Sequence, residues 1–291
     1  MTWFPLTLLC ALSLATSDAL TKKALTGRDE VLILWLRFVV SLPFLLGGLC
    51  FTPLPAPALG FWTTIATAMP LEILASILYV RALRLSPLSL ALPFLAFTPV
   101  FLLAVPFVLL GERIAPTGAV GIVLIAIGSY SLNLREIRHG FFAPLLAIYR
   151  EPGSRLMLAV AFLYSFTSTL GKKAITCSSP LFFGSVYYSL LVLVLAPYAL
   201  HRGRLDLVPE RRWDTLRAAF PPGLSYGVMI SSHLVALGLT QVAYMISVKR
   251  LSLVFGVLYG HLMFREEGLR ERLLGTGIMV AGVALIVWSS V

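Results

Sequence analysis

Most of this sequence consists of apolar runs of about 20 residues, and no other feature limits its fold as strongly. A run of that length suits an α-helix that crosses the hydrocarbon core of a membrane. We identify ten such runs, at residues 3–21, 31–51, 60–80, 87–110, 116–133, 156–171, 181–200, 221–239, 242–263 and 273–290. Hydrophobic residues make up 58% of the chain and charged residues only 12%, so a water-soluble domain of this length could not bury its apolar surface. The runs lack the alternation of barrel strands, and we therefore expect transmembrane helices.

The second constraint is an internal repeat. The stretch "LTKKALT" at residues 20–26 returns as "LGKKAIT" at residues 170–176, an offset of 150. Further matches follow in order at an offset of 154, and they pair Glu112 with Glu266, Gly121 with Gly275 and Gly128 with Gly282. Several ordered matches at a nearly constant offset indicate that the chain is an internal duplication.

The number of runs per copy predicts how the two copies are related. Residues 1–134 form the first repeat, residues 135–155 a polar linker and residues 156–291 the second repeat, with five runs in each copy. Because five is odd, the second copy begins on the opposite side of the membrane. We therefore expect an all-α integral membrane protein with ten transmembrane helices in two inverted five-helix repeats. Inverted repeats place a substrate site near the bilayer midplane, between the copies.

The basic residues predict the orientation of the chain. Of its 23 Lys and Arg, 17 fall in the odd-numbered connections between runs, and the even-numbered connections and both termini hold only Arg113, Lys172 and Lys173. The positive-inside rule then places both termini on the non-cytoplasmic side of a multi-pass inner-membrane protein. The net charge of +10 is thus a topology signal, and we expect the lipid bilayer, and no nucleic acid, as a partner.

The order of these segments resembles a known family. "YVRALRLSPLSLALPFLAFTPVFLL" followed by "LGERIAPTGAVGIVLIAIG", with its counterpart "AYMISVKRLSLVFGVLYGHLMFREE" and "LLGTGIMVAGVALI", is similar to EamA-type members of the drug/metabolite transporter superfamily. The resemblance implies a secondary transporter that exports a small metabolite, amino acid or drug by alternating access, with proton coupling as one mechanism. Family members usually have cytoplasmic termini, and here the charges point the other way. We expect no cofactor or metal; a monomer suffices, and a homodimer stays open.

Two other function classes are alternatives to export. A flippase for a lipid-linked or phosphorylated carrier would use the same fold and differ only in its substrate. A membrane-embedded enzyme is not favoured, because the sequence has no HExxH, no nucleophile triad and no carboxylate cluster for a metal. The sequence also lacks GxxxxGK[ST], so ATP is not expected to be the direct energy source.

Glu72 is the sharpest candidate for the substrate or proton pathway. It lies about eleven residues into the third run, near the bilayer midplane. An ionised group there costs about 2.5–3.5 kcal/mol on insertion scales unless it is paired or hydrated. The resemblance extends to small multidrug exporters, which use a membrane carboxylate for proton exchange. In those proteins the carboxylate lies on the first helix of the repeat, whereas Glu72 lies in the third run. The alternative is that Glu72 is a structural partner for a buried base.

Lys249 and Arg250 are two further pathway candidates. They lie inside the ninth run, and the aligned positions in the fourth run are Leu95 and Ala96, so the charges exist in one copy only. Adjacent helical residues point about 100° apart, so we do not expect both to face the centre of one cavity. One is expected to line the path, while the other meets a carboxylate or snorkels. An anionic or zwitterionic substrate, or a salt bridge to Glu72, would explain the pair.

Three more residues complete the predicted pathway. Arg37 lies about a third into the second run, where packing, gating and substrate contact are all open. His233 lies in the middle of the eighth run and aligns with Tyr79 of the first copy; it either titrates or packs with a hydrogen bond. Asp18 lies outside the predicted pathway, because its i, i+4 spacing to Lys22 favours a local ion pair.

Prolines and glycines predict where the helices bend and touch. Pro93 and Pro99 fall in the fourth run and can kink it into a hinge. Gly256 and Gly260 in the ninth run have the spacing of close helix packing. The repeated glycine pairs 121/128 and 275/282 predict that the fifth and tenth helices pack together as scaffold.

Overall fold

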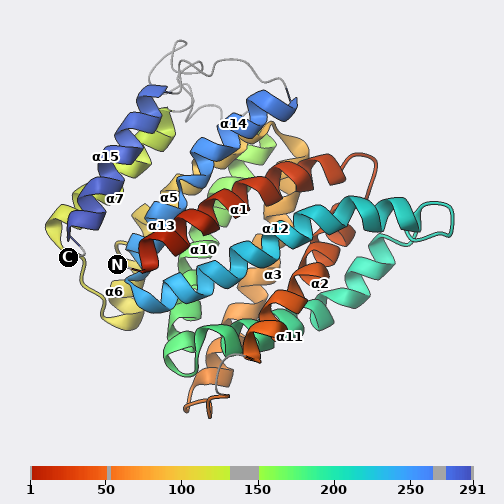
Figure 1. The fold of residues 1–291 in the computed structure, drawn as a ribbon, viewed down its shortest axis with the longest axis horizontal. Helices are drawn as coiled ribbons and strands as arrows, with labels where there is room; N and C mark the ends of the chain where they lie inside the picture. The colour runs from red at the N-terminus through yellow and green to blue at the C-terminus, as the bar shows by residue number, and fades with distance from the viewer. Residues whose placement is uncertain (1, 51–53, 132–150, 265–272, 290–291) are drawn as a thin grey trace.

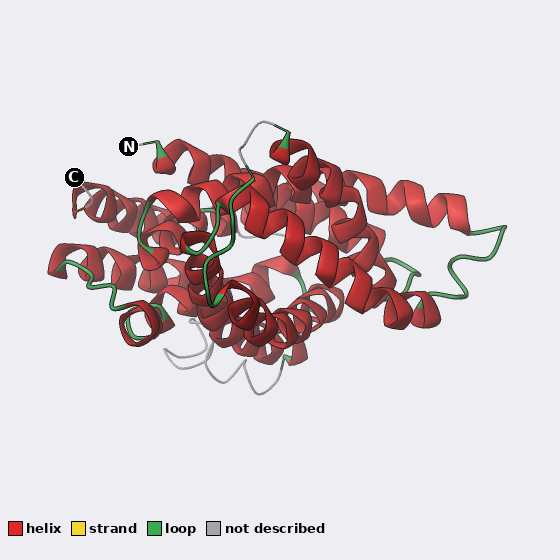
Figure 2. Ribbon diagram, turned by 90° about the horizontal axis from the view of Figure 1, so that it is seen from below, coloured by secondary structure: helices red, strands yellow, loops and turns green. Residues whose placement is uncertain are grey.

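The computed structural model describes residues 2–50, 54–131, 151–264 and 273–289, and these form helices and connections without a strand (Figure 2). The described elements are α1 (Trp3–Ala24), α2 (Glu30–Leu49), α3 (Phe61–Leu85), α4 (Leu88–Ala91), η1 (Leu92–Ala96), α5 (Phe97–Phe101), α6 (Val105–Leu110), α7 (Pro116–Ser131), α10 (Pro152–Thr176), α11 (Pro180–Arg202), α12 (Arg212–Leu239), α13 (Val242–Lys249), α14 (Ser252–Phe264) and α15 (Leu273–Ser289). Most of the predicted linker 135–155 lies outside the described residues.

The all-helical class is confirmed for the described chain, and the count of ten spans is not. Six segments are long and apolar enough to cross a membrane: α1, α2, α3, α11, α12 and Val242–Met263. Phe94–Leu110, Pro116–Ser129 and Leu274–Ser289 are shorter apolar helical segments. The 25-residue α10 is not among the six, and it packs along α3 inside the bundle.

The fourth run is not one continuous helix, as its expected range 87–110 implied. It is divided into α4, the 3-10 helix η1, α5 and α6. Pro93, Pro99 and Pro106 lie in η1, α5 and α6 in turn, and each lacks the N–H that an α-helix would use. The physical reason for the division is therefore visible in the sequence.

The ninth run is also broken, at Arg250 and Leu251 between α13 and α14. No proline is present there. The backbone N–H groups of Arg250 and Leu251 instead donate to the carbonyls of Ser247 and Val248, three residues earlier, at 3.0 Å each. These tight turns end the α-helical ladder and let the chain restart at Ser252.

Helices α7 and α15 lie side by side at one edge of the bundle (Figure 1). A Cβ built on Gly121 would stand 2.6 Å from the carbonyl oxygen of Gly282, and one on Gly282 would stand 2.6 Å from that of Gly121. Gly128 meets the carbonyl of Gly275 at the same distance. The predicted packing of these two helices is confirmed. Gly121 and Gly282 approach each other's carbonyl oxygens at the same distance, as expected for two copies related by a twofold axis.

Four of the connections that the structure describes form two groups. In one group, Arg202 at the end of α11 is 3.1 Å from Asp29 before α2, and Asp206 accepts a hydrogen bond from the Asp29 N–H at 2.7 Å. The connections α1–α2 and α11–α12 therefore meet, at the right of Figure 1. In the other group, the Ala58 N–H donates to the Cys177 carbonyl at 2.8 Å and joins the connections α2–α3 and α10–α11. The first and seventh connections therefore meet each other, and so do the second and sixth; for these four, odd-numbered and even-numbered connections are separate.

Candidate functional site

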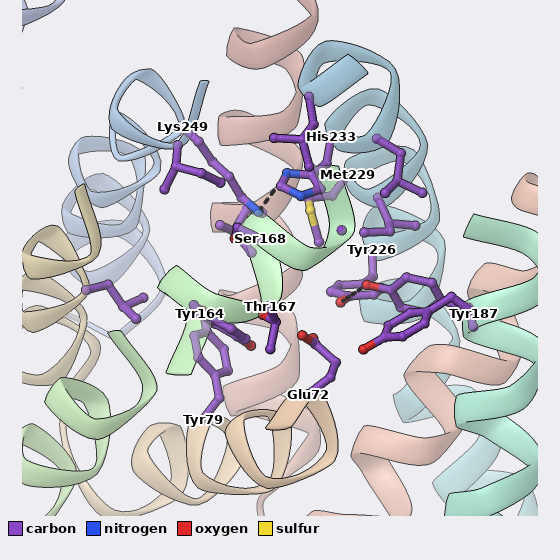
Figure 3. Close-up of a pocket in the computed structure, with 18 of the residues that line it drawn as sticks. Glu72, Tyr79, Tyr164, Thr167, Ser168, Tyr187, Tyr226, Met229, His233 and Lys249 are labelled. Atoms are coloured by element: carbon purple, nitrogen blue, oxygen red, sulfur yellow. Dashed lines mark hydrogen bonds between the residues drawn. The ribbon is translucent and has the colours of Figure 1, made fainter. Parts of the chain in front are cut away.

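A cavity lies between the helices of the two copies (Figure 3). It holds about 810 Å³ of space outside the atoms, including the part open to solvent. Helices α1, α2, α3 and η1 line it from the first copy, and α10, α11, α12 and α13 line it from the second. The structure brings all six predicted pathway residues into its lining: Glu72, Lys249, Arg250, Arg37, Tyr79 and His233. Their role in transport stays a prediction.

Asp18, Arg37 and Tyr79 form one buried cluster on the first copy. The Tyr79 hydroxyl donates a hydrogen bond of 2.5 Å to Oδ2 of Asp18. Nη1 of Arg37 lies 3.7 Å from Oδ1 of the same carboxylate, and both side chains are 3% exposed. A buried ion pair of this kind needs such extra hydrogen bonds to offset the loss of water.

The predicted local ion pair between Asp18 and Lys22 is wrong. Nζ of Lys22 donates instead to the Ser86 carbonyl at 2.6 Å, at the end of α3. Helical spacing placed Lys22 within reach of Asp18, but the carbonyl end of α3 offers acceptors to Lys22, and α2 brings Arg37 to Asp18. Only packing between helices makes these partners available.

Arg37 also contacts an aromatic ring across the cavity. Its guanidinium carbon lies 4.4 Å from the ring centre of Tyr226, which comes from α12 of the second copy. A cation over an aromatic face at this range is attracted by the ring quadrupole. Arg37 therefore links Asp18 of α1 to Tyr226 of α12, and so joins the two copies at the cavity wall.

Lys249 lies beside His233 on the second copy. Nζ of Lys249 and Nδ1 of His233 are 3.3 Å apart, and the contact is drawn as a dashed line in Figure 3. An ammonium has only donors, so Nδ1 accepts when Lys249 is charged, and the ring proton then lies on Nε2. His233 is thus a hydrogen-bonded histidine, one of the two alternatives drawn from the sequence.

Arg250 lines the same cavity as Lys249, contrary to the expectation that adjacent residues cannot both do so. The expectation assumed a continuous helix, whereas α13 ends at Lys249 and Arg250 occupies a turn. Arg250 is 3% exposed, and its Nε atom is buried without a hydrogen-bond partner. It is a buried cation placed at a helix break.

Glu72 lies on α3 and points into the cavity toward Thr167 of α10 (Figure 3). It is 9% exposed, and the hydroxyls of Thr167 and Ser76 and the charge of Lys249 lie in its surroundings. The ion pairs within 4 Å in the described chain do not include Glu72. A salt bridge from Lys249 or Arg250 to Glu72, one of the explanations drawn from the sequence, is therefore absent from these residues.

Sequence reasoning missed a group of tyrosines around Glu72. Tyr164 from α10, Tyr187 and Tyr188 from α11 and Tyr226 from α12 line the cavity. The hydroxyls of Tyr188 and Tyr226 lie 3.2 Å apart. Tyrosines in membrane helices usually lie at the interfaces, where the hydroxyl meets water. Four tyrosines well inside apolar helices were therefore an available signal for a polar interior.

The predicted hinge and packing residues lie in the two broken runs. Pro93 and Pro99 lie in the divided fourth run, and Pro99 is buried. Gly256 of α14 faces Leu92 of η1, whose Cδ1 would be 3.3 Å from an added Cβ. Gly260 is also buried. The broken fourth and ninth runs therefore pack against each other where Gly256 stands.

The described residues contain no group of three or more His, Cys, Asp or Glu side chains that could hold a metal ion. Three cations, Arg37, Lys249 and Arg250, and the carboxylate of Glu72 line the cavity. Asp18 lies behind Arg37. Such an arrangement can bind a charged solute and take up or release a proton.

Three comparisons bear on this cavity and fold. The model of the EamA-like transporter family matches residues 1–134 and 152–288. A solved structure titled "Crystal structure of protein" aligns over 98% of each chain, with a TM-score of 0.69 and 17% sequence identity. At that identity the likeness supports the fold alone. No curated protein matches this sequence.

Proposed function

Because this chain belongs to the EamA-like transporter family, we propose that it exports a small polar metabolite, amino acid or drug across the inner membrane by alternating access. The observation that carries the proposal is the cavity itself. It is lined from both copies, and buried charged side chains face it inside an apolar bundle. Each charge is costly in such a place, and charged residues inside membrane proteins usually mark a substrate or ion path.

The broken fourth and ninth runs support a movement of the cavity walls. Leu95 of η1 and Ile246 of α13 both line the cavity, next to the points where the helices are interrupted. Interrupted helices at a midplane site are common in transporters with inverted repeats. We propose that these two runs move when the cavity changes from being open on one side of the membrane to being open on the other.

Glu72 is the proton-coupling group in this proposal. It is buried, faces the cavity and has no ion-pair partner within 4 Å among the described side chains. A carboxylate without a fixed counter-charge is stabilised either by a cationic group of the substrate, such as the ammonium of an amino acid, or by a proton. Binding of a substrate that brings a cationic group to Glu72 would release the proton from Glu72. This is the exchange step of an antiporter.

The test is proton release from the purified, detergent-solubilised protein, titrated with a panel of amino acids and cationic drugs. Wild type is expected to release protons on binding, and Glu72→Gln is expected to bind without release. Glu210→Gln is the matched control, because Glu210 is exposed and lies outside the cavity. Binding with equal proton release in wild type and Glu72→Gln would remove Glu72 from the coupling step.

We also propose that both termini face away from the cytoplasm. The proposal rests on the bias of Lys and Arg toward the odd-numbered connections, two of which meet at one end of the bundle. Single cysteines introduced at Arg204 and at Ala58, in a background without Cys10, Cys50 and Cys177, test it with an impermeant thiol reagent on intact cells. Labelling of Ala58→Cys alone is expected, and labelling of Arg204→Cys alone would reverse the orientation.

A further inference from the structure

We infer that the substrate of this cavity carries an oxyanion, a carboxylate or a phosphate, and that Arg250 binds it with help from Lys249. The inference rests on the proposed function, because it names the substrate class of the same cavity. It is argued from the side chains of Arg250 and Lys249, whereas proton coupling is argued from the carboxylate of Glu72.

The first step is that Arg250 has no fixed partner. Its side chain forms no hydrogen bond and no ion pair within 4 Å with the residues that the structure describes, and its Nε is buried. A guanidinium carries five N–H donors in a planar fork, and leaving it unpaired in a protein interior is costly. Asp18, an acidic group in its surroundings, is already engaged by Arg37 and Tyr79.

The second step is that another cation stands directly beside it. Lys249 uses one donor on His233, at 3.3 Å, and an ammonium has three. Both residues stand at the C-terminal end of α13, where the partial negative charge of a helix end favours cations. That end carries only about half an elementary charge, and so it does not balance two cations.

The third step is the charge of the whole cavity. Arg37, Lys249 and Arg250 line it as cations, against the carboxylate of Glu72 and that of Asp18 behind Arg37. One positive charge is in excess when both carboxylates are ionised, and a second is in excess when Glu72 is protonated. A bound monoanion reduces the excess in either state, whereas a bound monocation increases it.

The fourth step is that the fold does not require these charges. The aligned positions in the first copy are Leu95 and Ala96, which are 2% and 1% exposed. The same scaffold position therefore packs well with apolar side chains. Since charge at this position is present in one copy only and costs stability, a ligand is the physical reason that remains for it.

The geometry points to an oxyanion rather than a halide. The planar fork of arginine matches the two oxygens of a carboxylate or phosphate in a bidentate contact. Tyrosine rings and hydroxyls also line the cavity and can hold the rest of the solute.

The test measures binding to the full chain in phosphatidylcholine nanodiscs by the shift of its thermal unfolding. The probes are matched sets on one carbon skeleton: the carboxylate, the phosphate ester, the neutral amide and the amine. The expected result is that carboxylates or phosphates raise the unfolding temperature, while the amide and amine of the same skeleton do not. A panel in which only amines bind, or in which no oxyanion binds, overturns the inference.

Variants assign the effect to Arg250. Arg250→Gln is expected to weaken oxyanion binding about tenfold to a hundredfold, as for loss of hydrogen bonds to a charged group, and Arg250→Lys to keep part of it. Arg217→Gln is the matched control, because Arg217 is exposed on α12 and lies outside the cavity. Unchanged oxyanion affinity in Arg250→Gln overturns the assignment.

The ligand-free stability of the same variants separates a binding role from a structural one. If Arg250 serves a ligand, Arg250→Gln without ligand unfolds at the same temperature as wild type or higher, because an unpaired buried charge has been removed. If Arg250 is structural, the ligand-free variant unfolds at a lower temperature, and the inference fails. Lys249→Gln and its exposed control Lys173→Gln repeat the comparison for the second cation.

Two further arms identify the source of the oxyanion and keep the two proposals distinct. Stabilisation by added phosphatidylglycerol that depends on Arg250, with no effect of soluble anions, would assign the oxyanion to a lipid headgroup. In proteoliposomes, an oxyanion that binds but is not moved contradicts the proposed function alone. A cation that is moved equally well by wild type and Arg250→Gln contradicts the inference alone.

Discussion

Lys22 and Lys172 make the same contact in the two copies of the repeat, 150 positions apart. Nζ of Lys22 donates to the carbonyl of Ser86, which follows the last residue of α3. Nζ of Lys172 donates to the carbonyls of Leu237, Gly238 and Thr240 at 2.7, 3.1 and 3.0 Å, where α12 ends. Each lysine thus satisfies the free carbonyl end of the third helix of its copy, just before the broken run begins.

Lys172→Met is expected to lower the free energy of unfolding by about 1.5–3 kcal/mol, because the carbonyls at the end of α12 lose a charged donor. Lys173→Met is the matched control. Because the side chain of Lys173 is exposed, this substitution should change the free energy of unfolding by no more than about 0.5 kcal/mol. Equilibrium unfolding in mixed micelles measures both. Equal losses in the two variants would show that the positive charge of the segment, rather than this contact, matters.

Gly282→Ala is expected to destabilise the α7–α15 pair by about 1–3 kcal/mol, because the new methyl group meets the Gly121 carbonyl oxygen at 2.6 Å. Gly277→Ala in the same helix is the control, as nothing lies within 4 Å of an added Cβ there. It should be neutral or slightly stabilising, since alanine favours a helix. Thermal unfolding of both variants checks this, and a tolerated Gly282→Ala would contradict the close packing of the seam.

Tyr79→Phe is expected to lower the free energy of unfolding by about 1.5–3 kcal/mol, because buried Asp18 loses a hydrogen bond. Asp18→Asn is expected to cost more, about 3–5 kcal/mol, since it leaves Arg37 as an unpaired buried charge. Tyr187→Phe serves as the stability control, because the Tyr187 hydroxyl is buried without a partner. Unfolding temperatures in the order Asp18→Asn, Tyr79→Phe, Tyr187→Phe, from lowest to highest, are predicted.

Asp206→Ala is expected to loosen the end of the bundle where two connections meet. The carboxylate accepts from the Asp29 N–H at 2.7 Å and pairs with Arg211 at 3.1 Å, so its removal should cost about 1.5–3 kcal/mol. Asp214→Ala nearby is the control, because Asp214 is exposed. Amide hydrogen exchange at the start of α2 is the measurement, and unchanged protection there in Asp206→Ala would contradict the link.

Much of the architecture follows from local patterns in the sequence. Apolar runs of membrane length predict helices because the backbone must satisfy its own hydrogen bonds in lipid. The glycine pairs at 121/128 and 275/282 predict the α7–α15 contact, because only glycine lets two backbones approach so closely. Glu72, Lys249, Arg250, Arg37 and His233 stand out because a charged or titratable group inside an apolar run is rare and costly.

Partners across the bundle were decided by tertiary structure alone. Spacing along one helix favoured Lys22 as the partner of Asp18, whereas the folded chain brings Arg37 and Tyr79 to it from α2 and α3. A continuous ninth helix would have turned Arg250 away from Lys249, whereas a break at Leu251, with no proline to announce it, places both on the cavity. Periodicity records which groups lie on one helix face; which groups meet across helices depends on packing between segments far apart in the chain.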